Sequence, residues 1–400
     1  MKQRVLIVNK FYYRRGGDCV CTLNLEELLH RQGHETAVFA MQYPENLPSG
    51  WSRYWPAEVD FGGGAGAKVK ALKRTLGMGD VKSKFQALLR DFKPDVVHLN
   101  NIHSYLSPVL AVMARKAGAK VVWTLHDYKL LCPSYSCLDP RGEVCERCFQ
   151  GKLPVLTQRC MKGSLAASAV ALLEAIRWSR RGVEKSVDMF VCPSEFMRGK
   201  MRQGGWNADK LTTLCNFIAP EMIDAYRNAP ASETRDDYYC YVGRLSKEKG
   251  VETLMDTASK LPYKLKVAGG GPLSDELKAK YSSCGNIEFL GHLNGGQVRE
   301  LLGNARFSVI PSEWYENNPL GVIESLCAGT PVVGAEIGGI PELVEGGNGV
   351  TFESGNSESL ANAIRRQWSA VPDYGTIQAQ ALKRFSPEAH YALLMSIYGE

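Results

Sequence analysis

The sequence predicts an α/β protein built as two halves, each with a parallel sheet covered by helices. Short apolar runs alternate with helical patterns along the chain, which is typical of parallel strands joined by crossover helices. Two series of these runs are separated by Leu214–Pro220 and the polar stretch Asn228–Asp237, where we expect a hinge. A chain of 400 residues, 44% of them apolar, is long enough to bury two cores.

The expected strands follow in order through both halves. In the first half they are Val5–Val8, Glu35–Ala40, Val96–Leu99, Val121–Leu125 and Met189–Cys192. In the second half they are Tyr238–Val242, Lys264–Ala268, Ile287–Leu290, Phe307–Ile310, Pro331–Gly334 and Gly349–Phe352. A last segment, Pro387–Tyr398, is amphipathic and is expected to form a helix that crosses back onto the first half. The predicted domains are therefore residues 1–215, with the helix of about residues 385–400 packed on them, and residues 216–384.

The composition argues against a membrane-spanning protein and favours a cytoplasmic enzyme. No apolar run approaches the roughly 20 residues that a bilayer requires, and the start of the chain lacks the long apolar segment of a signal peptide. Twelve cysteines are scattered along the chain, which favours reduced thiols over a disulfide framework. A formal net charge of +6 is small for 400 residues, and no nucleic-acid partner is expected.

The segment Pro311–Ser325 predicts a phosphate site at the start of a helix. Asn318 suits the N-cap and Pro319 the first helical position, because the N–H that proline lacks would have no partner there. The free N–H groups of Leu320 and Gly321, together with the positive end of the helix dipole, then form a ready site for a phosphate.

Two carboxylates flank this predicted phosphate site. Glu316 precedes the helix and Glu324 lies further along it. Acids near a bound anion are suited to accept hydrogen bonds from neighbouring hydroxyls. A diphosphate with sugar hydroxyls on both sides describes a nucleotide-sugar. The alternative is two exposed acids beside a capped helix.

Two cations follow the first strand of the second half. Arg244 and Lys249 can reach the anion at the Pro319 helix, and two cations suit a diphosphate leaving group. A solvated basic turn is the alternative. After the next strand, Gly270 lies in a glycine run whose flexible backbone can accommodate a ring or a ribose.

The strand ends of the first half are also polar. Gly16 and Gly17 allow close backbone approach, and Asp18 can cap the helix that follows; a plain turn is the alternative. This loop is not a G-x-G-x-x-G turn, so a standard NAD site is not expected. Three histidines, at positions 98, 103 and 126, indicate a polar cleft. His126 is the favoured functional residue, with one ring nitrogen for a sugar hydroxyl and the other for Asp127. The spacing of these histidines does not favour catalytic zinc.

A cysteine-rich loop predicts a structural zinc site. Cys145 and Cys148 form a Cys-x2-Cys pair, and Cys132 and Cys160 are favoured over Cys137 for the remaining two positions. Spare reduced thiols, an iron–sulfur cluster and a redox switch are the alternatives.

Aromatic residues precede a basic stretch in the first half. Trp51, Tyr54, Trp55 and Phe61 are followed by a run of cations with one acid, Asp80. Such a stretch can dock on an anionic membrane surface, although a solvated basic helix is the commoner explanation. The protein is accordingly expected in the cytoplasm, with peripheral contact to the inner face of the cytoplasmic membrane.

Four segments together resemble the retaining glycosyltransferases of family 4, which have the GT-B fold. They are Gly16–Gly17, Thr124–Asp127, Val242–Gly250, and Glu316–Glu324 with Ala328–Val333. The resemblance runs in order through nearly the whole chain. It implies two Rossmann-like domains that face a central cleft, with the donor held mainly by the second.

The resemblance also implies roles for residues. In the second half, Glu316 would contact hydroxyls of the transferred sugar, Glu324 would contact the ribose, and Arg244 and Lys249 would bind the diphosphate. Asn317–Asn318 departs from the pattern, because many relatives carry a glycine or an aromatic residue there, and this leaves the donor sugar open.

In the first half, the resemblance places His126 against the donor sugar and Gly16 and Gly17 near the phosphates and the acceptor. The implied reaction proceeds on one face of the sugar with retention of configuration, and the leaving phosphate helps to deprotonate the acceptor hydroxyl. No Asp-x-Asp pair is present, so a catalytic metal is not expected.

The implied function is transfer of a hexose from a nucleotide-diphosphate sugar to a glycan acceptor. A UDP-sugar is favoured over GDP-mannose as donor. The expected acceptor is a polyprenyl-diphosphate-linked oligosaccharide of capsule, O-antigen or exopolysaccharide synthesis. A sugar-nucleotide epimerase of similar fold and a non-catalytic glycan-binding relative are the alternatives.

Overall fold

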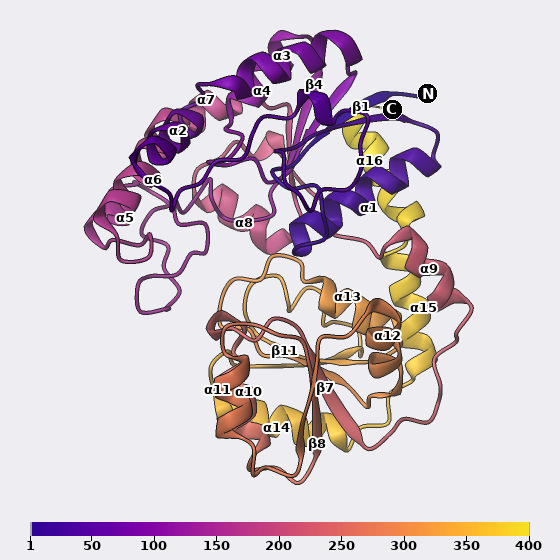
Figure 1. Ribbon diagram of the computed structural model, residues 1–400. Helices are drawn as coiled ribbons and strands as arrows, with labels where there is room; N and C mark the ends of the chain where they lie inside the picture. The colour runs from indigo at the N-terminus through magenta and orange to yellow at the C-terminus, as the bar shows by residue number, and fades with distance from the viewer. Residues whose placement is uncertain (1, 400) are drawn as a thin grey trace. The chain divides into compact units, whose positions relative to one another are not determined.

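The computed structural model describes residues 2–399 and divides the chain into two compact units (Figure 1). Unit 1 comprises Met1–Cys215 and His390–Glu400, and unit 2 comprises Asn216–Ala389. Each unit contains a six-stranded sheet whose paired strands all run parallel. The prediction of two α/β halves is confirmed.

The sheet of unit 1 has the strand order β2-β1-β3-β4-β5-β6. Its strands are β1 (Arg4–Val8), β2 (Glu35–Phe39), β3 (Val96–Leu99), β4 (Lys120–Thr124), β5 (Met189–Cys192) and β6 (Leu211–Thr213). Residues Val5–Val8 are fully buried, as expected of a parallel strand with both faces covered. The helices of this part of the chain are α1 (Gly17–Arg31), α2 (Ala65–Thr75), α3 (Asp80–Phe92), α4 (Val109–Lys116), α5 (Pro154–Thr157), α6 (Leu165–Arg177), α7 (Arg180–Glu184) and α8 (Glu195–Gln203), with 3-10 turns η1 (Ser52–Tyr54) and η2 (Ala208–Lys210).

The sheet of unit 2 has the order β12-β11-β10-β7-β8-β9. Its strands are β7 (Tyr238–Val242), β8 (Lys264–Ala268), β9 (Ile287–Gly291), β10 (Ser308–Ile310), β11 (Val332–Ala335) and β12 (Gly349–Phe352). The helices are α9 (Pro220–Arg227), α10 (Val251–Ala258), α11 (Ser274–Lys280), α12 (Gly295–Asn304), α13 (Leu320–Cys327), α14 (Ser357–Trp368) and α15 (Tyr374–Arg384), with the 3-10 turn η3 (Lys247–Lys249).

The strand order reverses direction once in each sheet. In unit 2 the chain passes from β7 outward to β8 and β9, then returns to the other side of β7 as β10. Ligands of open parallel sheets bind beyond the carboxyl ends of the strands at such a reversal. The corresponding point in unit 1 lies between β1 and β3.

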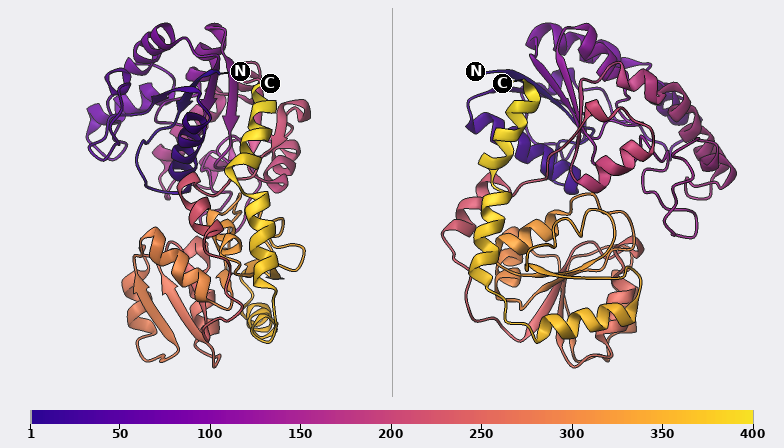
Figure 2. Two further views of the ribbon diagram at one scale, coloured as in Figure 1. Left: turned by 90° about the vertical axis from the view of Figure 1, so that its right-hand side faces the viewer. Right: turned by 180° about the vertical axis from the view of Figure 1, so that it is seen from behind.

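The last helix, α16 (Pro387–Tyr398), forms where the sequence predicts it. Leu394, Met395 and Tyr398 join Val5 and Ile7 in the core of unit 1. Both views in Figure 2 show the end of α16 (yellow) beside the start of the chain. Among the helices that the structure describes, none combines the length and apolar character needed to cross a bilayer.

Candidate functional site

The reversal point of unit 2 brings the loops after β7 and β10 together. Glu313 N–H donates to the carbonyl of Glu248 (2.9 Å), and Thr253 Oγ1 donates to Glu313 Oε1 (2.5 Å). These bonds join the loop that carries Arg244 and Lys249 to the loop that carries Glu316. The start of α13 is also close, because a Cβ on Gly321 would lie 3.9 Å from the carbonyl of Val242 at the end of β7.

Glu316 and Lys249 form a partly buried ion pair at this point. Lys249 Nζ lies 2.6 Å from Glu316 Oε1, and Ser312 Oγ donates to the same oxygen at 2.7 Å. The Lys249 ammonium also lies 5.1 Å from the ring centroid of Trp314. Burial by itself would raise the pKa of Glu316, but the Lys249 charge and the hydrogen bonds outweigh it and hold the pKa below its usual value. The carboxylate is therefore ionised at neutral pH and accepts hydrogen bonds only.

Two glycines make the close packing of these loops attainable. Gly250 has φ +64°, and a Cβ there would lie 1.9 Å from the carbonyl oxygen of Pro311. Gly338 has φ +63°, and a Cβ there would lie 2.3 Å from the carbonyl oxygen of Glu316. Only glycine adopts such a conformation at so short an approach without strain. Gly338 thus lies against the Glu316 backbone itself, and Gly250 lies against Pro311 at the start of the same loop.

The start of α13 differs from the prediction in its cap. The N-cap is Pro319 and the helix begins at Leu320. Asn318 is not the cap, because its Oδ1 accepts from Asn216 N (2.9 Å) and its carbonyl accepts from Asn216 Nδ2 (2.7 Å). The loop is anchored by this exchange and needs no side-chain cap. By helix geometry, the N–H groups of Leu320 and Gly321 still have no intrahelical acceptor, so the predicted phosphate site keeps its donors.

The remaining predicted residues of unit 2 surround the same strand ends. Arg244 is exposed directly after β7, and Tyr241 Oη donates to its carbonyl (2.8 Å). Gly270 follows β8, and its carbonyl accepts from Leu245 N–H (3.0 Å). Glu324 lies one helical turn into α13, and among the residues that the structure describes its carboxylate accepts no hydrogen bond and forms no ion pair. Burial raises the pKa of Glu324 to about 7.

Unit 1 gathers polar groups at its own reversal point. His126 Nε2 lies 2.9 Å from Asn100 Oδ1, and burial lowers the pKa of His126 to about 4, so the ring is neutral. Asp127 is not its partner as predicted, because Asp127 Oδ1 accepts from Lys129 N–H (2.9 Å). The role of His126 against a donor sugar stays a prediction.

The glycine loop after β1 also differs in one detail. Gly16 is the N-cap of α1 and Gly17 its first residue, and a Cβ on Gly17 would meet no atom within 4 Å. Asp18 does not cap the helix; its Oδ2 accepts from Asn101 Nδ2 (2.9 Å). The backbone at Gly16 and Gly17 is therefore open, as the prediction requires, while Asp18 holds the β3 loop.

The other two histidines are structural. His98 lies between Tyr398 Oη (2.6 Å) and Thr124 Oγ1 (2.7 Å), and burial lowers its pKa to about 3. His103 packs against Trp123 with ring centroids 5.1 Å apart. His98 thus supports α16, whereas His126 bonds to Asn100.

The cysteines do not form the predicted four-ligand arrangement. In residues 2–399 no group of three or more His, Cys, Asp or Glu side chains is placed to hold a metal ion. Cys132 Sγ instead lies 3.1 Å from Ser134 Oγ, and Cys148 and Cys160 pack in a small apolar cluster. The structural zinc site at Cys132, Cys145, Cys148 and Cys160 gains no support from this geometry and stays a prediction.

The aromatic part of the predicted membrane segment is mostly inside the protein, and of its four rings only Phe61, at 38%, is exposed. Tyr54 and Trp55 are buried, and Trp55 Nε1 donates to the carbonyl of Val38 (2.8 Å). Trp51 packs edge-on against Phe92, with centroids 5.1 Å apart. These rings belong to the core because the chain folds back along β2 before α2 begins.

The sequence reasoning missed Ser312 and Asn216. Ser312 lies four residues before Glu316 and donates to its carboxylate, and Asn216 anchors Asn318 from far along the chain. The first contact lay within the segment already singled out. The second had no local signal, since 102 residues separate the two asparagines.

Two families of known proteins match this chain. Residues 15–222 match the family described as Glycosyltransferase Family 4, and residues 222–370 match Glycosyl transferases group 1. The chain is 24% identical over 354 residues to an uncharacterized 42.6 kDa protein in the cps region of Klebsiella pneumoniae, covering 85% of this chain and 87% of that protein. It is 36% identical over 196 residues to the Escherichia coli O-antigen biosynthesis glycosyltransferase WbnH, covering 48% of this chain and 54% of that one.

The fold has close counterparts among solved structures. Anabaena Alr3699/HepE in complex with UDP-glucose superposes with a TM-score of 0.63 at 18% identity, covering 99% of both chains. At this identity the likeness shows the fold alone. It confirms the predicted two-domain α/β architecture of the GT-B type.

Proposed function

Since the chain belongs to glycosyltransferase family 4, we propose that it transfers a hexose from a nucleotide-diphosphate sugar to a glycan acceptor with retention of configuration and without a catalytic metal. A UDP-sugar is the favoured donor. The carrying observation is the buried Glu316 carboxylate, held ionised by Lys249 at the strand reversal of unit 2. An acceptor-only group in that place suits the hydroxyls of a sugar.

The proposed donor site assigns one task to each neighbouring group. The N–H groups at the start of α13 and the cations of Arg244 and Lys249 bind the diphosphate and offset the charge that develops as the glycosidic bond breaks. Glu316 accepts from hydroxyls of the transferred sugar, and Glu324 from the ribose. A leaving phosphate oxygen then accepts the proton of the acceptor hydroxyl.

The proposed acceptor is a polyprenyl-diphosphate-linked oligosaccharide. Its support comes from the relatives, one named for O-antigen biosynthesis and one encoded in a cps region. The UDP-glucose complex of HepE, which shares the fold, supports a UDP-linked donor.

A thermal-shift screen against UDP, GDP, ADP and their sugars identifies the nucleotide, because a ligand that binds only the folded state raises its stability. Transfer is then measured as nucleotide release in the presence of a lipid-linked oligosaccharide. Glu316→Gln is expected to keep nucleotide binding and to lower transfer about 100-fold or more, as for loss of one preorganised polar group.

The control is Glu345→Gln, an exposed carboxylate of the same unit, which should transfer as the unchanged protein does. Donor consumption without an acceptor would instead indicate an epimerase. Unchanged turnover in Glu316→Gln would remove Glu316 from the mechanism.

A further inference from the structure

Helix α6 exposes three large apolar side chains and buries its carboxylate. Leu165, Leu173 and Ile176 are 54%, 49% and 62% exposed, whereas Ser168 and Glu174 are buried. A helix on the surface of a globular protein normally shows the opposite arrangement. The outer side of α6 is therefore an apolar face that the described residues of unit 1 leave about half exposed.

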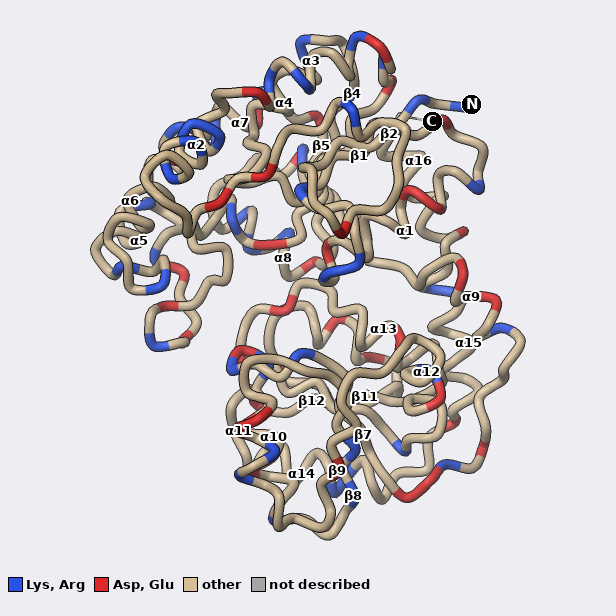
Figure 3. Tube along the Cα trace, viewed as in Figure 1, with Lys and Arg blue, Asp and Glu red and all other residues tan. Residues whose placement is uncertain are grey.

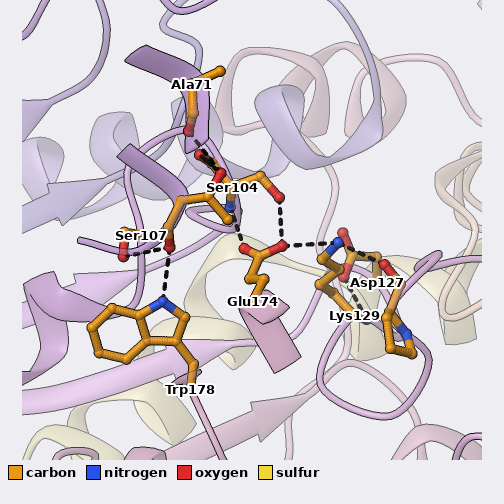
Figure 4. Close-up of polar contacts among 9 residues, drawn as sticks. Ala71, Ser104, Ser107, Asp127, Lys129, Glu174 and Trp178 are labelled. Atoms are coloured by element: carbon orange, nitrogen blue, oxygen red, sulfur yellow. Dashed lines mark hydrogen bonds and ion pairs between the residues drawn. The ribbon is translucent and has the colours of Figure 1, made fainter. Parts of the chain in front are cut away.

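The orientation of α6 is fixed by a buried polar network (Figure 4). Glu174 accepts from Ser104 N (2.7 Å) and Ser104 Oγ (2.8 Å), and it pairs with Lys129 Nζ at 3.1 Å. Just beyond the helix, Trp178 Nε1 donates to the carbonyl of Thr75 at the end of α2 (2.9 Å). Rotating α6 to hide its leucines would leave the Glu174 charge unpaired, which is costly.

Exposed apolar residues concentrate around this helix and its neighbours. Twelve large apolar side chains are recorded as exposed in the part of the chain that the structure describes, and nine of them lie between Phe61 and Ile176. Leu153, just before α5, and Val69 on α2 belong to this group. Figure 1 shows α2, α5 and α6 along one side of unit 1. The exposed apolar surface therefore extends over several helices and is not limited to one residue.

The same region is strongly cationic. Residues 151–182 contain six Lys or Arg and one acid, and that acid is the buried Glu174. Residues 62–79, which include α2, contain three exposed lysines and no acid, whereas their fourth cation, Arg74, is buried and pairs with Asp80. Figure 3 shows the basic segments on α2 and near α5 and α7. The exposed cations next to α6 are Arg159, Lys162, Arg177, Arg180 and Arg181.

We propose that this docking face, formed by α6 with its flanking cations, binds the surface of an anionic lipid bilayer. Leu165, Leu173 and Ile176 insert among the acyl chains near the headgroups, and the arginines at the end of α6 bind anionic headgroups. An apolar helix face flanked by cations is the arrangement of interfacial helices. The face is centred on α6, which the sequence did not single out, and it lies beside the basic stretch on α2 that the sequence offered as a membrane contact.

A second copy of the chain is a poorer occupant of the same face. In a twofold interface the same patch meets itself, so the cations of one copy would lie against those of the other. No exposed acid in residues 151–182 is present to neutralise them. Like charges at an interface oppose association. An anionic bilayer supplies the missing charge.

The proposal rests on a function with a lipid-linked acceptor, but vesicle binding can be measured without donor or acceptor. Its outcome is therefore separate from that of the transfer assay. The full chain is sedimented with vesicles of phosphatidylcholine alone or with added phosphatidylglycerol. Binding is expected only with phosphatidylglycerol and should weaken as salt rises. Leu173→Glu/Ile176→Glu should weaken vesicle binding about tenfold or more, since the variant loses two apolar side chains that would be buried in the bilayer.

Arg177→Gln/Arg181→Gln should also weaken vesicle binding about tenfold. The matched controls are Val371→Glu and Lys278→Gln/Lys383→Gln, which change exposed residues of unit 2 and should bind as the unchanged protein does. Thermal unfolding confirms that each variant is folded. The proposal is overturned if the unchanged protein ignores anionic vesicles or if Leu173→Glu/Ile176→Glu binds them equally well. It is also overturned if the unchanged protein forms a dimer, does not bind vesicles and becomes a monomer in the Leu173→Glu/Ile176→Glu variant, because the face would then be a dimer interface.

Discussion

Lys249 has two tasks in the donor site, and they can be separated by pH. Its ammonium is proposed to bind diphosphate, and it also keeps the buried Glu316 ionised. The pKa of Glu316 lies below its usual value only because Lys249 and the hydrogen bonds offset burial. Removing the charge should therefore move the titration of Glu316 upward, in addition to any loss of donor affinity.

Lys249→Met is expected to shift the acidic limb of the pH–rate profile to higher pH. In the unchanged protein the carboxylate stays ionised to below its ordinary pKa, so activity should persist into mildly acid solution. In the variant the Lys249 charge no longer offsets burial, and activity should begin to fall at a higher pH than in the unchanged protein. The measurement is kcat/KM against pH; an unmoved limb with uniformly lower activity would mean that Lys249 acts on the donor alone.

Glu324 is a destabilising residue at the pH where it would serve. Its pKa is raised to about 7 in the folded chain, so the folded state binds a proton more tightly than the unfolded state. Stability is therefore lost as the pH rises from about 4.5 to 7. Glu324→Gln should raise the stability of unit 2 at pH 8, by at most about 3 kcal/mol, and change it little at pH 4. Denaturant unfolding at both pH values checks this, and an equal gain at both would contradict it.

At the scale of elements, Gly250 sets how closely the loop after β7 approaches the loop after β10. Gly250→Ala places a Cβ 1.9 Å from the carbonyl oxygen of Pro311 at φ +64°. The variant is expected to lose about 1–3 kcal/mol of unfolding free energy and to weaken nucleotide binding, because the Lys249 loop must move. Gly285→Ala is the control, since its Cβ would meet no atom within 4 Å. Equal stability of both variants would show that the loops tolerate displacement.

The sequence predicts elements well where the pattern is local. β3, β5, β7, β8, β12 and α16 begin and end at the predicted residues, because each is a distinct apolar run or amphipathic stretch. β6 is missed since its three residues, Leu211–Thr213, include a single apolar side chain. Glu316, Lys249 and the open start of α13 could be placed from spacing, whereas the anchoring of Asn318 could not. Its partner Asn216 lies elsewhere in the sequence.

The inverted orientation of α6 also escapes sequence reasoning. The segment Leu165–Arg177 is apolar on most sides, so its pattern alone cannot tell which residues face inward. The deciding contacts are those of Glu174 with Ser104 and Lys129, which are 70 and 45 positions away and have no local signal.

At the scale of the whole molecule, neutral histidines support the fold of unit 1. His98 is buried and His390 is half-buried, desolvation lowers their pKa values to about 3 and about 4, and His98 bonds to Tyr398 of α16. Both would be protonated in the unfolded chain below about pH 6.5. The stability of unit 1 should therefore be full above pH 6.5 and fall as the pH drops toward 4.

His98→Asn is expected to lower stability at pH 7.5 by roughly 1–3 kcal/mol, since the Tyr398 hydroxyl is left buried without its partner. It should also flatten the dependence between pH 6.5 and 4, because one titrating group is gone. Denaturant unfolding followed by tryptophan fluorescence across this range checks the prediction. A dependence as steep as in the unchanged protein would assign the acid sensitivity to other groups.

The return of α16 to unit 1 limits how the protein can be divided for experiments. A fragment that stops at Cys215 carries all six strands of the first sheet. It lacks the core residues Leu394, Met395 and Tyr398 and would leave the apolar side chains of Val5 and Ile7 uncovered on that side. Such a fragment should be poorly soluble when expressed alone. Supplying residues 387–399 as a separate peptide, or grafting them after Cys215 through a flexible tether, should restore it.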